Sequence, residues 1–159
     1  MNTRIIGFGN TILRDDGAGI YAVREVGRRL KESGDRAPPD IVESEAAGFA
    51  LLELMAGWER VILVDSIQFD NLKAGTVIRI DPNDLRTSLK LRSIHEIDLP
   101  TALEVGRRLG FAMPRDVVVI GIQAEDARTF GESLSPAVAL GMNEAVELIL
   151  QAAGDNVVG

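Results

Sequence analysis

The sequence contains no cysteine and only one histidine among its 159 residues. Disulfides, thiolate metal sites and cysteine nucleophiles are therefore excluded. No stretch approaches the run of about 18 apolar residues that a membrane helix requires. The first residues, MNTRIIGFGN, also lack the charged leader and long apolar run of a signal peptide. From these absences we expect a cytoplasmic protein that does not bind a membrane.

Basic residues are also few, since 17 Lys and Arg face 24 Asp and Glu and give a formal net charge of -7. Binding of phosphate backbones requires clustered Lys and Arg, so we expect no nucleic acid partner. Apolar residues make up 46% of the chain and charged residues 26%, which is ordinary for a globular protein. The length is that of a single domain with one substantial core, and we predict one domain over residues 1–159.

Patterns typical of strands alternate along the chain with patterns typical of helices. Short apolar or β-branched runs predict strands, and apolar residues at helical spacing predict helices. The predicted strands cover residues 4–8, 40–44, 60–65, 76–80 and 116–122, and the predicted helices cover 17–30, 49–57, 98–109 and 135–149. Ser135 as N-cap and Pro136 in the first turn mark the start of the last helix. This order predicts an α/β fold, a single three-layer domain with a mostly parallel central sheet flanked by helices.

A glycine-rich turn follows the first predicted strand and reads Gly7-x-Gly9-Asn10, with Asp15-Asp16-Gly17 shortly after it. Ile12 stands at the position of the third glycine of GxGxxG, which disfavours a dinucleotide site. Asp15 and Asp16 precede a helix, and either could cap it. Two successive residues cannot both cap in the same way, so we expect one carboxylate to face the carboxyl edge of the sheet, where ligands bind in open α/β sheets.

Two further residues are candidates for chemistry at that edge. Asp65 closes the predicted strand RVILVD, although it could equally start a turn with Ser66. His95 is the single histidine, and a lone loop histidine is more often a surface residue than a ligand. Together, two carboxylates and an imidazole form an oxygen-rich divalent-metal site with open positions, suited to nickel, zinc or manganese. Three ligands would bind the metal weakly unless a substrate supplied more.

Several motifs, in order, resemble the hydrogenase maturation proteases, which process the large subunit of [NiFe] hydrogenases. The opening IIGFGNTILRDDGAGIYAVREV is similar to the family signature G-x-G-N-x-L-x-x-D-D/E-x-x-G. The resemblance continues through VILVDSIQ, GTVIRIDPNDL, SIHEIDLPTAL and VVVIGIQAEDARTFGESLSPAV. It implies that Asp16, Asp65 and His95 bind a metal and carry the catalysis. The implied metal is nickel that the large-subunit precursor brings with it, although other divalent metals could occupy the site in vitro. The implied reaction is one cut that releases a C-terminal peptide from that precursor.

One segment departs from the family pattern. Where the family commonly has a D-G-G-T loop, this chain has Glu43-Ser44-Glu45-Ala46-Ala47-Gly48, which removes the glycine pair and adds a carboxylate. This change bears on substrate preference, and it leaves open a non-catalytic binder or sensor of the metallated precursor. A nucleotide-binding oxidoreductase is a further alternative. Whether the metal activates water, or one carboxylate acts as general base while nickel serves for recognition, also stays open.

Overall fold

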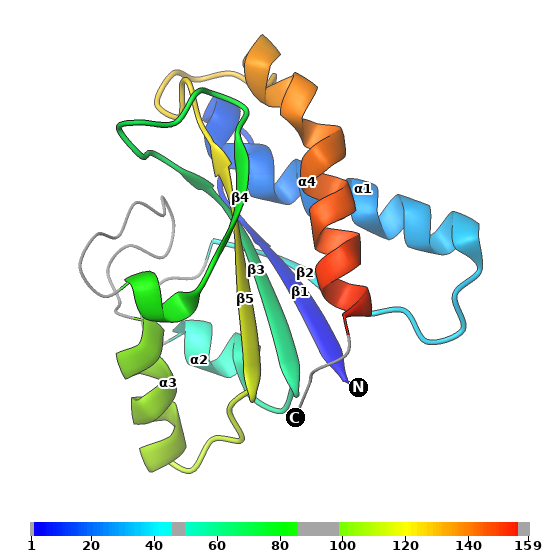
Figure 1. Cartoon of the computed structure of the whole chain (residues 1–159), viewed down its shortest axis with the longest axis vertical. Helices are drawn as coiled ribbons and strands as arrows, with labels where there is room; N and C mark the ends of the chain where they lie inside the picture. Colours follow the sequence, from blue (N-terminus) through cyan, green and yellow to red (C-terminus); the bar gives the residue numbers. More distant parts are fainter. Residues whose placement is uncertain (1, 46–49, 86–98, 156–159) are drawn as a thin grey trace.

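The computed structural model describes residues 2–45, 50–85 and 99–155. Within them, five strands form one sheet in the order β2-β1-β3-β5-β4 (Figure 1). The strands are β1 (Thr3–Phe8), β2 (Asp40–Ser44), β3 (Arg60–Ile67), β4 (Val77–Ile80) and β5 (Asp116–Gln123). Only β4, at one edge, runs antiparallel to its neighbour. The predicted α/β class with a mostly parallel sheet is confirmed.

Helices cover both faces of this sheet and complete three layers. The helices α1 (Ala18–Ser33) and α4 (Pro136–Gly154) pack together over one face, whereas α2 (Ala50–Met55) and α3 (Leu99–Arg108) lie on the other (Figure 1). Each face has its own apolar cluster, because the side chains of every strand alternate between the two faces. Two short 3₁₀ helices, η1 (Arg14–Gly17) and η2 (Pro82–Leu85), follow β1 and β4.

The third strand is longer than the sequence predicts. Every residue of β3 is buried, as expected for a central strand covered on both faces. Its ladder with β5 continues beyond Asp65, since Ser66 pairs with Ile122 and Ile67 with Gln123. The prediction that Asp65 closes the strand is therefore wrong by two residues. A polar residue is tolerated inside the strand because it lies near the carboxyl edge.

The first helix begins at Ala18, one residue later than predicted, because Gly17 is the last residue of η1. The starts predicted at Phe49 and Asp98 lie outside the described residues, and α2 and α3 are present immediately after them. The last helix begins at Pro136 as predicted. None of the helices in the described part of the chain is long and apolar enough to span a membrane.

The start of α1 lies directly on the carboxyl ends of β1 and β3, and a glycine makes this possible. A Cβ atom at Gly19 would lie 2.5 Å from the Val64 carbonyl oxygen and 2.6 Å from that of Phe8. Both obstacles are backbone atoms of central strands, which cannot move aside easily. Gly19 therefore fixes the height at which η1 and α1 sit over the sheet edge.

We predict that Gly19→Ala lowers the free energy of unfolding by about 2–3 kcal/mol, because overpacking against backbone forces the helix off the sheet. Gly27→Ala, in the same helix, is the matched control. Its Cβ would meet only the Cδ1 atom of Ile41 at 3.3 Å. Helix propensity would then favour alanine by about 1 kcal/mol. Urea unfolding of both variants checks the pair, and equal stabilities would contradict the prediction.

Candidate functional site

The two neighbouring aspartates of η1 have different roles. The Asp15 side chain is fully buried and accepts four hydrogen bonds. Its Oδ2 accepts the backbone N–H of Glu125 and of Asp126, at 3.0 and 2.9 Å. The two remaining bonds come from Ser135, whose backbone N–H donates to Oδ1 and whose hydroxyl donates to Oδ2, both at 2.7 Å. Asp15 therefore holds the segment between β5 and α4 against η1.

Neither aspartate caps α1, so the capping interpretation is wrong. The N-cap of α1 is Gly17, and no side chain bonds to the helix start there. The Ser135 hydroxyl likewise does not cap α4, although Ser135 occupies the predicted N-cap position. The hydroxyl donates its hydrogen bond to Asp15 instead. The local sequence indicates a cap in both cases because Asp and Ser are common there. A partner about 120 residues away takes the side chain.

Backbone hydrogen bonds join the same two segments. Arg14 N–H donates to the Gly131 carbonyl and Gly131 N–H donates to the Ile12 carbonyl, both at 2.9 Å. Asp15 N–H donates to the Asp126 carbonyl at 2.9 Å. The Tyr21 hydroxyl adds a bond of 2.6 Å to the Glu132 carbonyl. We call residues 10–16 and 125–135, joined in this way, the rim unit; it lies at the carboxyl edge of the sheet (Figure 1).

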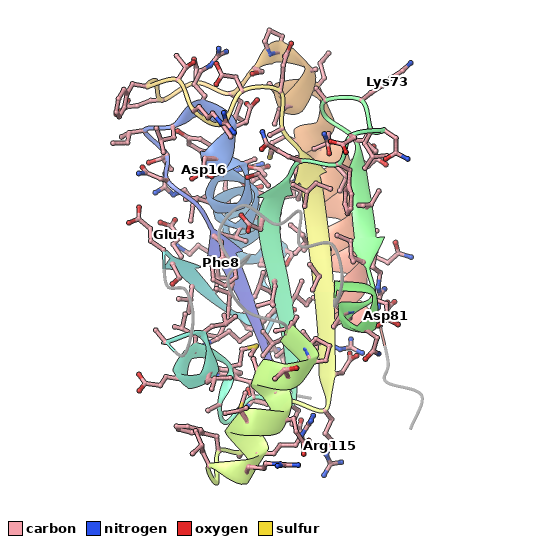
Figure 2. All side chains as sticks on the ribbon, turned by 90° about the vertical axis from the view of Figure 1, so that its left-hand side faces the viewer. Phe8, Asp16, Glu43, Lys73, Asp81 and Arg115 are labelled. Carbon is pink, nitrogen blue, oxygen red and sulfur yellow. The ribbon has the colours of Figure 1, made fainter. Side chains whose placement is uncertain are left out.

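Asp16 is held at this edge by the glycine-rich turn after β1. Its Oδ2 accepts the backbone N–H of Asn10 at 2.9 Å. The chain passes so close at Gly9 that a Cβ there would lie 1.8 Å from the Asp16 carbonyl oxygen, and Gly9 has φ 135°. Only glycine is compatible with that approach and that backbone conformation. Figure 2 shows Asp16 and Glu43 on the same side of the molecule, with Arg115 at the opposite end.

Asp65 lies in β3, next to β1 in the sheet, and is fully buried. Along β3, Leu63 and Ile67 contribute to the apolar cluster beneath α2 and α3. Asp65 lies two residues from each of them along the strand, so its side chain points to the same face of the sheet. Its Oδ1 accepts the backbone N–H of Ser66 at 2.9 Å.

The structure thus brings two of the three predicted site residues to one edge of the sheet. Asp16 belongs to η1, which packs beside β3, and Asp65 belongs to β3 itself. His95 lies outside the described residues. Within the described ranges, no group of three or more His, Asp or Glu side chains is placed to hold a metal ion. Two carboxylates alone provide hard oxygen ligands for a divalent cation, and a third ligand would have to come from elsewhere.

Gln123 is a residue that the motif analysis did not single out. Its buried side chain clamps the segment after β3, because Oε1 accepts the Phe69 N–H at 3.0 Å and Nε2 donates to the Phe69 carbonyl at 2.9 Å. The signal for it was a polar residue ending the β-branched run VVVIGIQ. Its role is positional, since it fixes the chain that leaves the carboxyl edge beyond Asp65.

The altered segment begins inside β2, where Glu43 forms an ion pair. Arg24 binds Glu43 through two hydrogen bonds of 2.5 and 3.0 Å. The hydrogen bond from Arg24 lowers the pKa of the Glu43 carboxyl below its usual range. Glu43 is thus a partner of α1. It stands where the family loop has its aspartate, so the added carboxylate is that of Glu45. Ala46 to Gly48 lie outside the described residues.

A groove of about 1190 Å³ lies away from this edge, beside α3 and the first residues of β5. Two of its charged side chains take part in ion pairs: Asp116 binds the buried Arg60, and Glu104 binds Arg108 at the surface. The arrangement of Asp16 and Asp65 indicates more clearly where chemistry would occur.

Comparison with known proteins agrees with these observations. The model of the hydrogenase maturation protease family HycI matches residues 21–152. The hydrogenase expression/formation protein HupD of Thiocapsa roseopersicina is 24% identical over 149 residues. That match covers 92% of this chain and 65% of HupD, so this chain spans about two-thirds of the relative's length.

Solved structures share the fold. The [NiFe] hydrogenase maturation protease HybD from Thermococcus kodakarensis superposes with a TM-score of 0.68 at 29% identity, covering 96% of this chain and 99% of that one. The hydrogenase maturating endopeptidase HybD from E. coli gives a TM-score of 0.73 at 24% identity, covering 96% and 91%. At that identity the second likeness shows the fold alone.

We predict that Asp15→Asn lowers the free energy of unfolding by at least about 3 kcal/mol. An amide can offer an oxygen to only one side of the site, so its NH₂ would face a buried N–H donor. Ser135→Ala is the graded control, because it removes one of the four bonds and is expected to cost about 1.5 kcal/mol. Urea unfolding at neutral pH measures both, and an Asp15→Asn variant as stable as Ser135→Ala would contradict the anchoring role.

The Asp126 carboxyl makes the rim unit sensitive to acid. Hydrogen bonds from Thr129 and from the Arg128 backbone lower its pKa from 3.8 to about 2. A carboxyl with a lowered folded pKa stabilises the fold above the unfolded pKa, and this contribution is lost as the pH falls through the folded pKa. We therefore expect Asp126→Asn to be less stable than wild type at pH 7 and the difference to vanish between pH 4 and 2. Urea midpoints across that range check it, and a constant difference would contradict it.

Proposed function

The chain belongs to the hydrogenase maturation protease family, and we propose that it removes the C-terminal extension of a nickel-loaded [NiFe] hydrogenase large-subunit precursor. The family match covers 132 consecutive residues of the chain, 21–152, which include Asp65 and His95 but not Asp16. The similar proteins are a hydrogenase expression/formation protein and hydrogenase maturation proteases. The substrate, the nickel and the position of the cut belong to the proposal. A cytoplasmic location also stays a prediction.

The observation that carries the proposal is the separation of the two adjacent aspartates. Asp15 is occupied by four donors from the rim unit. Asp16, one residue later, has its carboxylate at the carboxyl edge, where the N–H of Asn10 orients it. Such an orienting hydrogen bond is typical of carboxylates that ligate metals. Asp65 supplies a second carboxylate from the neighbouring strand.

The proposed third ligand is His95. It precedes the first residue of α3, Leu99, by four residues. Helix α3 covers the face of the sheet to which Asp65 belongs. We propose that its imidazole joins the carboxylate of Asp65 there. The nickel is part of the substrate, because the precursor brings it with ligands of its own, and two carboxylates with one imidazole would complete its shell.

The proposed reaction is hydrolysis of one peptide bond. Water adds to the scissile carbonyl carbon, the C–N bond breaks, and the leaving amine takes up a proton. The described residues offer two carboxylates and the chain has no cysteine, so an activated water fits this site better than a covalent thioester route. A carboxylate at the edge would take the proton of the attacking water or hold the metal that lowers its pKa.

We predict that Asp16→Asn, Asp65→Asn and His95→Ala each slow cleavage of a nickel-loaded precursor at least about 100-fold, because each removes a ligand or a base. Asp81→Asn is the control, since Asp81 lies away from Asp16 (Figure 2) and its Oδ1 accepts only local bonds from Asn83. Gel-shift assays of the trimmed product measure the rate, with urea unfolding as a check that each variant folds.

Two results would separate this proposal from its alternatives. Cleavage at the wild-type rate in any one of the three variants would remove that residue from the mechanism. A wild-type protein that binds the precursor without trimming it would instead support a non-catalytic binder or sensor. The oxidoreductase alternative is disfavoured by the family match and by Gly9, whose close approach is to Asp16 rather than to open space for a phosphate.

A further inference from the structure

Two large apolar side chains lie exposed on the rim unit. Phe130 is 80% exposed and Ile12 is 47% exposed, although both belong to segments held by many hydrogen bonds. An exposed aromatic on a mobile tail needs no explanation, but one on a fixed loop at the ligand-binding edge of a sheet is typical of an interaction site. We call Ile12 and Phe130 the apolar lip.

The backbone brings the two residues of the lip close together. Leu13 and Gly131 form a parallel bridge. Ile12 and Phe130 precede the two bridge partners, and the bond from Gly131 N–H to the Ile12 carbonyl holds their backbones close together.

The lip is also rigidly mounted. Arg14, two residues after Ile12, has φ 45°, a conformation that costs a residue with a Cβ about 1–2 kcal/mol. Hydrogen bonds offset that cost, because the Arg14 N–H donates to the Gly131 carbonyl and the Arg14 guanidinium donates to the Ser133 carbonyl and to Asp126. A surface held in place before binding loses little conformational freedom on binding, which favours affinity.

The lip is continuous with the site of the proposed reaction. The Ile12 N–H donates to the side-chain oxygen of Asn10, and the Asn10 N–H donates to Asp16. One short segment of chain therefore carries both an apolar contact surface and a proposed nickel ligand. A protein that places a metal against Asp16 would therefore come close to the residues of the lip.

We propose that the apolar lip binds an apolar side chain of the hydrogenase large-subunit precursor, next to the nickel, and so determines which precursor is bound. This inference rests on the proposed function, because the precursor is the occupant. A pair of exposed apolar residues beside a polar site fits the arrangement of binding hot spots, in which a few aromatic anchors carry most of the affinity.

The test is cleavage of the nickel-loaded large-subunit precursor from the same organism in single-turnover reactions at rising protease concentration. We expect Phe130→Ser to raise the half-saturating concentration at least about tenfold, the usual effect of losing an aromatic anchor, with the limiting rate unchanged. Phe130→Leu keeps an apolar group and is expected to stay within about threefold of wild type. Leu109→Ser is the matched control, since Leu109 is 65% exposed just beyond the end of α3.

Each outcome decides the inference. If Phe130→Ser has the half-saturating concentration of wild type, the lip proposal is overturned while the protease proposal stands. A lower limiting rate with an unchanged half-saturating concentration has the same consequence. A change only in oligomeric state, measured by light scattering, assigns the lip to a second copy of the chain and overturns it as well. If the wild-type protein does not cleave the precursor, its capture of the precursor on beads is measured instead of the cleavage rate. Binding that depends on Phe130 then supports the lip proposal and contradicts the protease proposal. Absence of binding contradicts both proposals.

Discussion

The carboxylate of Asp15 joins two ends of the chain that must meet for the carboxyl edge to exist. It is buried, and its four donors come from Glu125, Asp126 and Ser135. A buried carboxylate without such donors would be costly, so the segment after β5 must close over η1 whenever the fold forms. Because a 3₁₀ helix has three residues per turn, the next side chain points about 120° away. Anchoring through Asp15 thereby turns Asp16 toward the edge.

The glycines of the opening motif serve this packing rather than a ligand. In dinucleotide-binding folds, similarly placed glycines let a pyrophosphate approach the backbone. Here the space beside Gly9 is taken by the Asp16 carbonyl, and the space beside Gly19 by the carbonyls of Val64 and Phe8. Glycine, which has no side chain, therefore allows two segments of the protein backbone to contact each other here. The consequence is an acidic side chain at the place where other α/β folds hold an anion, which suits a cation instead.

Because the carboxyl edge is rigid, a partner that binds to it is held at a fixed position relative to Asp16. Asn10 bonds to Asp16 on one side and to the Ile12 backbone on the other, so the proposed contact at the lip and the proposed metal ligand are a few residues apart on one fixed segment. A partner that docks on such a segment is positioned relative to the carboxylate without further conformational search, which is how positioning contributes to rate. Gln123 provides the same rigidity across the edge by clamping Phe69.

The sequence by itself determined the alternation of strands and helices, the buried character of β3, the start of α4 at Pro136, and an acidic carboxyl edge that includes Asp16 and Asp65. These features follow from periodicity and composition within a few residues, which a single chain displays directly. Only the tertiary structure decided which aspartate anchors and which faces the edge, that the Ser135 hydroxyl serves Asp15 rather than α4, that β3 runs past Asp65, and that Ile12 lies beside Phe130. In each of these cases the deciding partner is more than 50 residues away, so no local pattern could reveal it. His95 remains a prediction of the sequence, while the packing of η1 beside β3 is what brings the two carboxylates to a common edge.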